Sequence, residues 1–270
     1  MKRKFKVLLT RRLHDFALTK LRERCEITIH SGKIPMPKQK ILEEIKDKDG
    51  LICFPYDIID QEILDSTNKL KTISTFSVGF DHIDINYAKK KRITIGYTPD
   101  VLTNATAELT IGLILDLLRR ITEGDHIIRK GKWNEIFGPF DYVGTEVSGK
   151  TLGILGMGRI GKTVAKKASC LGMNILYHNK KSIVNTGKAK YVSLNELFKK
   201  SDVISVHVPY SKNTHHMINS ALLRKMKKTS FLINTSRGKI VNQKDLLKIL
   251  QLKKIQGAAL DVFEDEPIGK

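Results

Sequence analysis

The chain has 270 residues, of which 41% are hydrophobic and 28% charged, a balance typical of globular rather than disordered proteins. One hydrophobic core rarely serves a chain of this length, so the sequence predicts two domains. The formal net charge is +20, from 48 Lys and Arg against 28 Asp and Glu. The basic residues are scattered, and no stripe alternates them with aromatic residues. We therefore expect no nucleic-acid partner in spite of the charge.

Cysteine usage and the apolar runs favour a cytoplasmic protein. The three cysteines have no metal-like spacing, and both Cys53 and Cys170 lie in apolar segments, which predicts buried free thiols in a reducing compartment. The longest apolar run, 109–118, contains Asp116 and is about half the length that a bilayer demands. The basic start of the chain lacks the features of a secretion signal. We expect no membrane association.

The first hundred residues alternate short β-rich runs with helical patterns, which predicts parallel strands joined by crossovers. The expected strands are residues 6–10, 26–30, 50–54, 70–76 and 93–97, and the expected helices are 15–24, 38–46 and 84–91. One long helix is predicted next, from about 104 to 130, with Gly131 as its stop. Its interior is apolar nearly all round, so we expect a buried helix that links two domains, 1–103 and 104–270.

A second alternating set begins at Lys150. The expected strands are 151–155, 174–177, 203–208, 230–234 and 256–260, and the expected helices are 160–171, 194–199, 221–226 and 243–250. Two helix starts carry capping residues, Ser193 with Glu196 and Asn242 with Asp245. The sequence thus predicts an α/β protein with two parallel-sheet domains, Rossmann-like or flavodoxin-like.

Residues 152–161 contain Gly-x-Gly-x-x-Gly between a predicted strand and a predicted helix. In a dinucleotide site, Gly156 permits the tight turn, Gly158 lets the backbone approach a pyrophosphate, and Gly161 lets helix pack on strand. The N–H groups at the helix start, at Arg159 and Ile160, would then face the phosphates. The alternative is a glycine-rich turn that binds no ligand.

The next predicted strand ends without the acidic residue that commonly binds a ribose 2′-hydroxyl. Asn179, Lys180 and Lys181 stand there instead, and their donors and positive charge suit a 2′-phosphate. The sequence therefore favours NADP(H), with NAD(H) also possible. The alternative is that both lysines are ordinary solvated residues of a Lys-rich chain.

Several ordered motifs together resemble the D-isomer-specific 2-hydroxyacid dehydrogenases, and most closely their glyoxylate/hydroxypyruvate reductases. The matching segments are 76–81, 104–108, 152–161, 202–209, 232–238 and 259–267. The resemblance implies an oxidoreductase that uses NAD(P)H to reduce a small 2-oxo acid, glyoxylate or hydroxypyruvate, to the D-2-hydroxy acid. It also implies a homodimer.

The resemblance assigns roles to individual residues. Arg237 would bind the substrate carboxylate and carbonyl, which suits a guanidinium that can fork two N–H donors. The backbone amides of Val78 and Gly79 would bind the carboxylate. Independently of the resemblance, Phe54 and Phe80 would narrow the pocket towards small acids, and the alternative is that both belong to the core. Glu266 would orient and charge an acid–base His. The remaining assignments concern the cofactor. Thr235 and Asp261 would lie near the nicotinamide, and Thr106 and Pro209 would lie along the cofactor groove.

The sequence departs from the family pattern in one respect. Family members carry the acid–base His in a loop after the counterpart of Glu266, followed by a helix that returns to the first domain, whereas the last His here is His216. None of the eight histidines matches that position. We therefore expect these 270 residues to be weakly active or inactive. A truncated chain, a non-catalytic NAD(P)-binding regulatory or scaffold protein, and a module completed by another chain all remain open.

Overall fold

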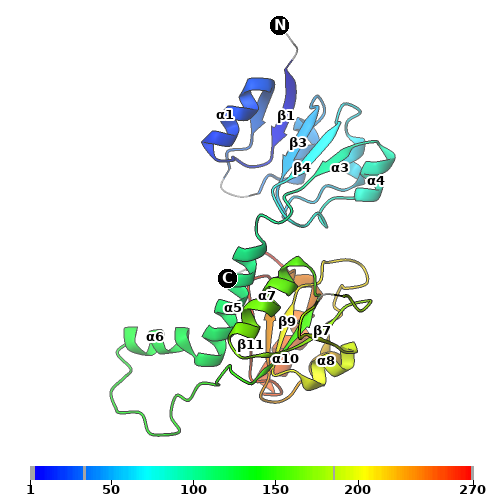
Figure 1. Ribbon diagram of the computed structural model, residues 1–270. Coiled ribbons are helices and arrows are strands. Elements are labelled where there is room, and N and C mark those ends of the chain that lie inside the picture. Colours follow the sequence, from blue (N-terminus) through cyan, green and yellow to red (C-terminus); the bar gives the residue numbers. More distant parts are fainter. Residues whose placement is uncertain (1–3, 33–34, 185, 269–270) are drawn as a thin grey trace. The chain divides into compact units, whose positions relative to one another are not determined.

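The computed structural model describes residues 4–32, 35–184 and 186–268 and divides the chain into two compact units. The first is Met1–Val101 and the second Leu102–Lys270, so the division falls two residues before the predicted boundary. Both units are parallel-sheet α/β structures, as the sequence predicts (Figure 1).

The first unit has a five-stranded parallel sheet with the order β2-β1-β3-β4-β5. This 2-1-3-4-5 order is that of flavodoxin-like folds. Leu8, Leu51 and Ile73, from the three central strands, are almost fully buried. The strands are β1 (Phe5–Leu9), β2 (Cys25–Ile29), β3 (Gly50–Cys53), β4 (Thr72–Thr75) and β5 (Thr94–Gly96). The helices are α1 (Asp15–Arg24), α2 (Lys38–Glu44), α3 (Gln61–Asp65) and α4 (Ile85–Lys90).

The second unit has a six-stranded parallel sheet with the order β11-β10-β9-β6-β7-β8. Counted from β6, this is the 3-2-1-4-5-6 order of the dinucleotide-binding fold, and the chain reverses its direction of winding between β6 and β9. The strands are β6 (Thr151–Leu155), β7 (Asn174–His178), β8 (Lys190–Tyr191), β9 (Val203–Val206), β10 (Phe231–Asn234) and β11 (Gly257–Leu260). The helices after β6 are α7 (Arg159–Cys170), α8 (Leu194–Lys200), α9 (Ser220–Leu223), α10 (Gln243–Gln251) and the 3-10 turn η1 (Gly238–Ile240).

Helices cover both faces of this sheet because its strands are apolar on both sides. In β10, Ile233 packs into the cluster that contains residues of α5 (Thr103–Arg119) and α7, while its neighbour Leu232 packs with α8, α9 and α10. Both predicted caps form: Ser193 and Glu196 make a reciprocal capping box, and Asn242 accepts from the Asp245 N–H at 3.0 Å. The short elements α3 and β8 were not predicted from the sequence.

The predicted single helix 104–130 is wrong: the structure has two helices, α5 (Thr103–Arg119) and α6 (Ile121–Arg129). Arg120 between them is left-handed, with φ 57°. The Asp116 carboxylate accepts from both the backbone N–H and the hydroxyl of Thr122, at 2.7 and 2.8 Å. Such a local acceptor competes with continuation of the helix. Burial was also mispredicted for the second part, because α6 has no buried residue and projects from the second unit (Figure 1).

The cysteine prediction is only partly correct. All three cysteines are free and Cys53 is buried, but Cys25 is half-buried and Cys170 is exposed. Cys170 ends α7, whose buried face is formed by Gly161, Val164, Ala165 and Ala168, and it lies off that face. Within the described residues, no helix is long and apolar enough to cross a membrane.

The turn from β6 to α7 depends on two close backbone approaches. Gly156 has φ 102°, and a Cβ there would lie 2.7 Å from the His207 carbonyl carbon. A Cβ at Gly161 would clash with the carbonyl oxygen of Gly156, which is part of the rigid turn. At Gly158, by contrast, a Cβ would meet nothing within 4 Å.

Gly161→Ala should therefore lower the free energy of unfolding by about 1–3 kcal/mol, the usual cost of forcing a methyl group into a packed site. Gly158→Ala is the matched control and should cost less, because its methyl group enters open space. Chemical denaturation of both variants measures the difference. Equal stabilities of the two variants would contradict this view of the turn.

Candidate functional site

The candidate residues of the second unit gather at the carboxyl ends of its strands. Asn234 is paired with both Val206 and Leu260, and Leu155 is paired with Val206 and His178. The residues that follow these five strand ends therefore line one edge of the sheet. They are Gly156, Asn179, His207 to Pro209, Thr235 and Asp261. In open parallel sheets this edge is where ligands bind, at the point where the strand order reverses.

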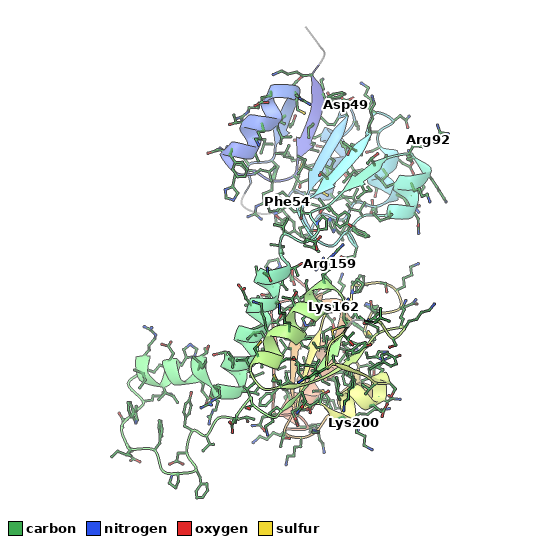
Figure 2. All side chains as sticks on the ribbon, viewed as in Figure 1. Asp49, Phe54, Arg92, Arg159, Lys162 and Lys200 are labelled. Atoms are coloured by element: carbon green, nitrogen blue, oxygen red, sulfur yellow. The ribbon has the colours of Figure 1, made fainter. Side chains whose placement is uncertain are left out.

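The glycine turn offers room for a phosphate at the start of α7. Gly158 caps this 12-residue helix, and the space beside its Cα is open. Arg159 begins the helix and Lys162 follows almost one turn later (Figure 2). Open space beside a helix N-terminus, with basic side chains near it, fits an anionic pyrophosphate.

Asn179 has a structural contact that sequence reasoning missed. Its side-chain oxygen accepts from the Met157 N–H at 2.8 Å, so it holds the glycine turn in place. Lys180 and Lys181 follow it and are exposed. The end of β7 thus carries two solvated lysines and no carboxylate.

Thr106 and Thr235 are brought together through a third threonine. The Thr110 hydroxyl lies 3.0 Å from that of Thr235, which is 125 positions away, and 2.8 Å from the Thr106 carbonyl oxygen. Thr110 is fully buried. This contact anchors the first part of α5 beside the end of β10.

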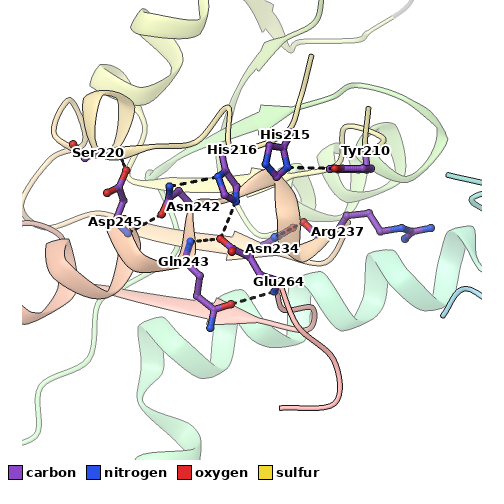
Figure 3. A network of polar contacts seen from close by, with 10 residues as sticks. All are labelled: Tyr210, His215, His216, Ser220, Asn234, Arg237, Asn242, Gln243, Asp245 and Glu264. Atoms are coloured by element: carbon purple, nitrogen blue, oxygen red, sulfur yellow. Dashed lines mark hydrogen bonds and ion pairs between the residues drawn. The ribbon is translucent and has the colours of Figure 1, made fainter. Parts of the chain in front are cut away.

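Arg237 projects from a turn that is built around the buried side chain of Asn234. The Asn234 amide donates to the Arg237 carbonyl at 3.0 Å, and its oxygen accepts from the backbone and hydroxyl of Ser236 at 3.1 and 2.9 Å. The Arg237 guanidinium also donates to the Ser236 carbonyl at 2.8 Å. Figure 3 shows the guanidinium pointing away from His216 and Glu264.

Asp261 and Glu266 interact electrostatically in the segment after β11. Partial burial raises the pKa of Asp261 above its ordinary value, and the negative charge of Glu266 raises it further. The Asp261 N–H donates to the Asn234 carbonyl at 3.0 Å, and the Glu266 carboxylate accepts from the Phe263 N–H at 2.8 Å. Both acidic groups therefore lie on the segment that the Arg237 turn contacts.

His207 is not suited to donate a proton near neutral pH. Burial lowers its pKa to about 4, and its Nε2 lies 2.8 Å from the Ser205 hydroxyl. A His with this pKa is neutral at pH 7.

In the first unit, Val78 and Gly79 lie on a loop after β4 that a polar network supports. The Ser77 hydroxyl donates to the Gly79 carbonyl, and the Thr75 hydroxyl lies 3.2 Å from that of Ser77. Thr75 also lies 2.9 Å from Nε2 of His82. This network was not predicted from the sequence, although its polar residues lie around the end of a strand.

Phe54, which follows β3 in the first unit, is buried (Figure 2). Its ring lies 5.4 Å from that of Phe76 and 5.9 Å from that of Tyr56. Its backbone N–H donates to the buried Asp57 carboxylate at 2.7 Å. Phe80, by contrast, is 42% exposed, so of the two only Phe80 offers much free ring surface.

Comparison with known proteins gives a consistent result. Residues 111–270 match the family model "D-isomer specific 2-hydroxyacid dehydrogenase, NAD binding domain". A glyoxylate reductase of Thermofilum pendens is 47% identical over 268 residues, which are 97% of this chain and 79% of that protein. A crystal structure of a Thermus thermophilus protein superposes with a TM-score of 0.90 at 40% identity, covering 98% of this chain and 84% of the other.

A second similar structure is that of an NADPH-dependent glyoxylate/hydroxypyruvate reductase of Sinorhizobium meliloti, in complex with NADP and malonate. Its TM-score is 0.88 at 27% identity, and the match covers 99% of this chain and 82% of that one. The family model spans more than half of the chain, and the relatives match nearly all of it. The chain therefore belongs to the D-isomer-specific 2-hydroxyacid dehydrogenases, oxidoreductases that act on a CH–OH group with NAD(P).

Proposed function

We propose that the protein reduces glyoxylate or hydroxypyruvate to the D-2-hydroxy acid with NADPH. The observation that carries the proposal is the meeting of three features at one edge of the second sheet. These are the glycine turn with open space at Gly158, the Arg237 turn after β10, and the acidic segment after β11. The Thermofilum pendens relative is named for the same reaction.

The proposed mechanism assigns binding and orientation to the protein. The Arg237 guanidinium binds the carboxylate and polarises the carbonyl of the 2-oxo acid through paired N–H donors. The Val78 and Gly79 amides donate to the carboxylate. Bound NADPH supplies the hydride. Reduction of the carbonyl would also require a general acid that protonates its oxygen.

The proposal also assigns the cofactor to this edge of the second sheet. The α7 N-terminus, at Arg159 and Ile160, would hold the pyrophosphate, and Lys180 and Lys181 would pair with the 2′-phosphate of NADP(H). Thr235 and Asp261 would border the nicotinamide, with Thr106 and Pro209 along the groove. The exposure of both lysines and the lack of a carboxylate after β7 support NADP(H) over NAD(H).

We also propose a homodimer that covers α6 and the segment after it. Ile128, Trp133, Ile136 and Phe140 are each more than half exposed, and the last two exceed 90%. Exposed apolar groups of this number are characteristic of interaction sites. A cytoplasmic location is part of the proposal, supported by the three free cysteines.

NADPH should bind more tightly than NADH, by roughly ten- to a hundredfold, because charge-assisted contacts to the 2′-phosphate are strong. Replacing Lys180 and Lys181 together by Ala should remove most of this preference. The exposed Lys199, on α8, is the control position. Fluorescence titration with both cofactors measures the affinities of wild type and variants, and a wild-type preference for NADH would refute the assignment.

In a chain continued by the His-bearing segment of the family type, Arg237→Lys should lower kcat/KM for glyoxylate by roughly ten- to a hundredfold, since an ammonium cannot make the paired contact. NADPH affinity should stay unchanged. Lys239→Gln, at an exposed position two residues later, is the control for a change of basic side chain elsewhere in the same turn. Unimpaired turnover by Arg237→Lys would place Arg237 outside the site.

A chain of these 270 residues alone should bind NADPH yet turn over glyoxylate about 10²–10⁴-fold more slowly than one continued by a His-bearing segment of the family type. The reason is that no His follows His216, so the general acid would be missing. Rate measurements on both chains test this, with NADPH affinity as the control. Equal rates would mean that another residue donates the proton.

A further inference from the structure

Glu264 lies in a run of three acidic residues but differs from its neighbours. Asp265 and Glu266 are exposed, whereas the Glu264 side chain is only 25% exposed. Its carboxylate accepts from the Gln243 N–H at 2.6 Å, at the start of α10. In return, the Glu264 N–H donates to the Gln243 side chain at 3.1 Å. The two residues therefore fasten the segment after β11 to α10.

The same carboxylate faces His216, from the loop between β9 and α9. Glu264 Oε1 lies 3.1 Å from His216 Nε2, which is ion-pair distance, although the two groups are not aligned as a hydrogen bond (Figure 3). The oxygen of Asn242 accepts from Asp245, so its NH₂ group is the one that faces His216 Nδ1, at 3.5 Å. A donor at Nδ1 places the ring proton on Nε2, toward Glu264.

The Glu264 contacts connect to the Arg237 turn through backbone packing. The His216 N–H donates to the Lys239 carbonyl at 2.9 Å. A Cβ at Gly238 would overlap the carbonyl group of Phe263, so these two backbones touch. A shift of residues 261–266 would therefore reach Gly238, the neighbour of Arg237. It would also move Glu266, which accepts from Phe263.

We propose that Glu264 is a positioning residue of the active site. Its carboxylate joins residues 261–266 to the start of α10 and to the His216 loop, and it thereby fixes Glu266 and Asp261 relative to Arg237. The proposal rests on the proposed function. The contacts of Glu264 join the segment after β11 to the start of α10 and to the His216 loop, and Glu264 belongs to neither apolar cluster of the second unit. Loss of the carboxylate should loosen this edge and leave the core intact.

Hydrogen exchange of backbone amides 261–266 tests the positioning directly, without need for turnover. Glu264→Ala should raise their exchange rates roughly ten- to a hundredfold, the effect of losing hydrogen bonds to a charged acceptor. Glu264→Gln keeps an oxygen for the Gln243 N–H but loses the charge that faces His216, so its rates should be intermediate. Asp265→Asn, in the same run, should exchange as the wild type does. Exchange in α7 should be unchanged in every variant.

Kinetics of the same variants test the consequence. Glu264→Ala should lower kcat for glyoxylate about tenfold or more, with NADPH affinity within about threefold of wild type, and Glu264→Gln should recover part of the loss. Wild-type exchange at 261–266 in Glu264→Ala, a rise of the same size in α7, or a wild-type kcat would each overturn the proposal. These kinetics use a chain continued by the His-bearing segment of the family type. If that wild-type chain reduces neither 2-oxo acid, the proposed function fails, while the exchange data still decide whether Glu264 holds this segment.

Discussion

The arrangement of the second unit depends on the register of its parallel strands. Because Asn234 is opposite both Val206 and Leu260, the residues just after β9, β10 and β11 lie in one row. A shift of a single residue would turn every side chain of a strand to the other face of the sheet. The register is held by apolar residues on both faces, such as Leu232 and Ile233 in β10. The core therefore determines where Thr235, Arg237 and Asp261 are placed.

The strands and the glycine turn could be predicted from the sequence because their signals are local. Apolar β-rich runs between helical patterns are read within a few residues, and Gly156, Gly158 and Gly161 have fixed spacing. The break at Arg120 could not be read in this way. The run of helix-forming residues continues through it, and only the contact of Asp116 with Thr122 reveals a second helix start.

Contacts between segments that are far apart along the chain also could not be predicted from the sequence. The Thr110–Thr235 contact joins positions 125 residues apart, and Asn179 supports Met157 across the sheet edge. Glu264, Asp265 and Glu266 look equivalent in a list of charges, yet the path of the chain places only Glu264 against α10 and His216. The family pattern assigns Glu266 the role of orienting an acid–base His. The contacts of Glu264 instead indicate that it positions the segment after β11.

The positive net charge of the chain and the two carboxylates at this edge have opposite effects on an anionic ligand. A 2-oxo acid and a dinucleotide phosphate are both anions, and a net charge of +20 favours their approach. Asp261 and Glu266 work against that attraction, and the raised pKa of Asp261 reflects both its desolvation and its repulsion by Glu266. Acidic groups held together beside an anion site are electrostatically unfavourable there. Both residues are exposed, so solvent screens part of this repulsion, and the orienting role expected for Glu266 beside an acid–base His would account for a carboxylate at this place.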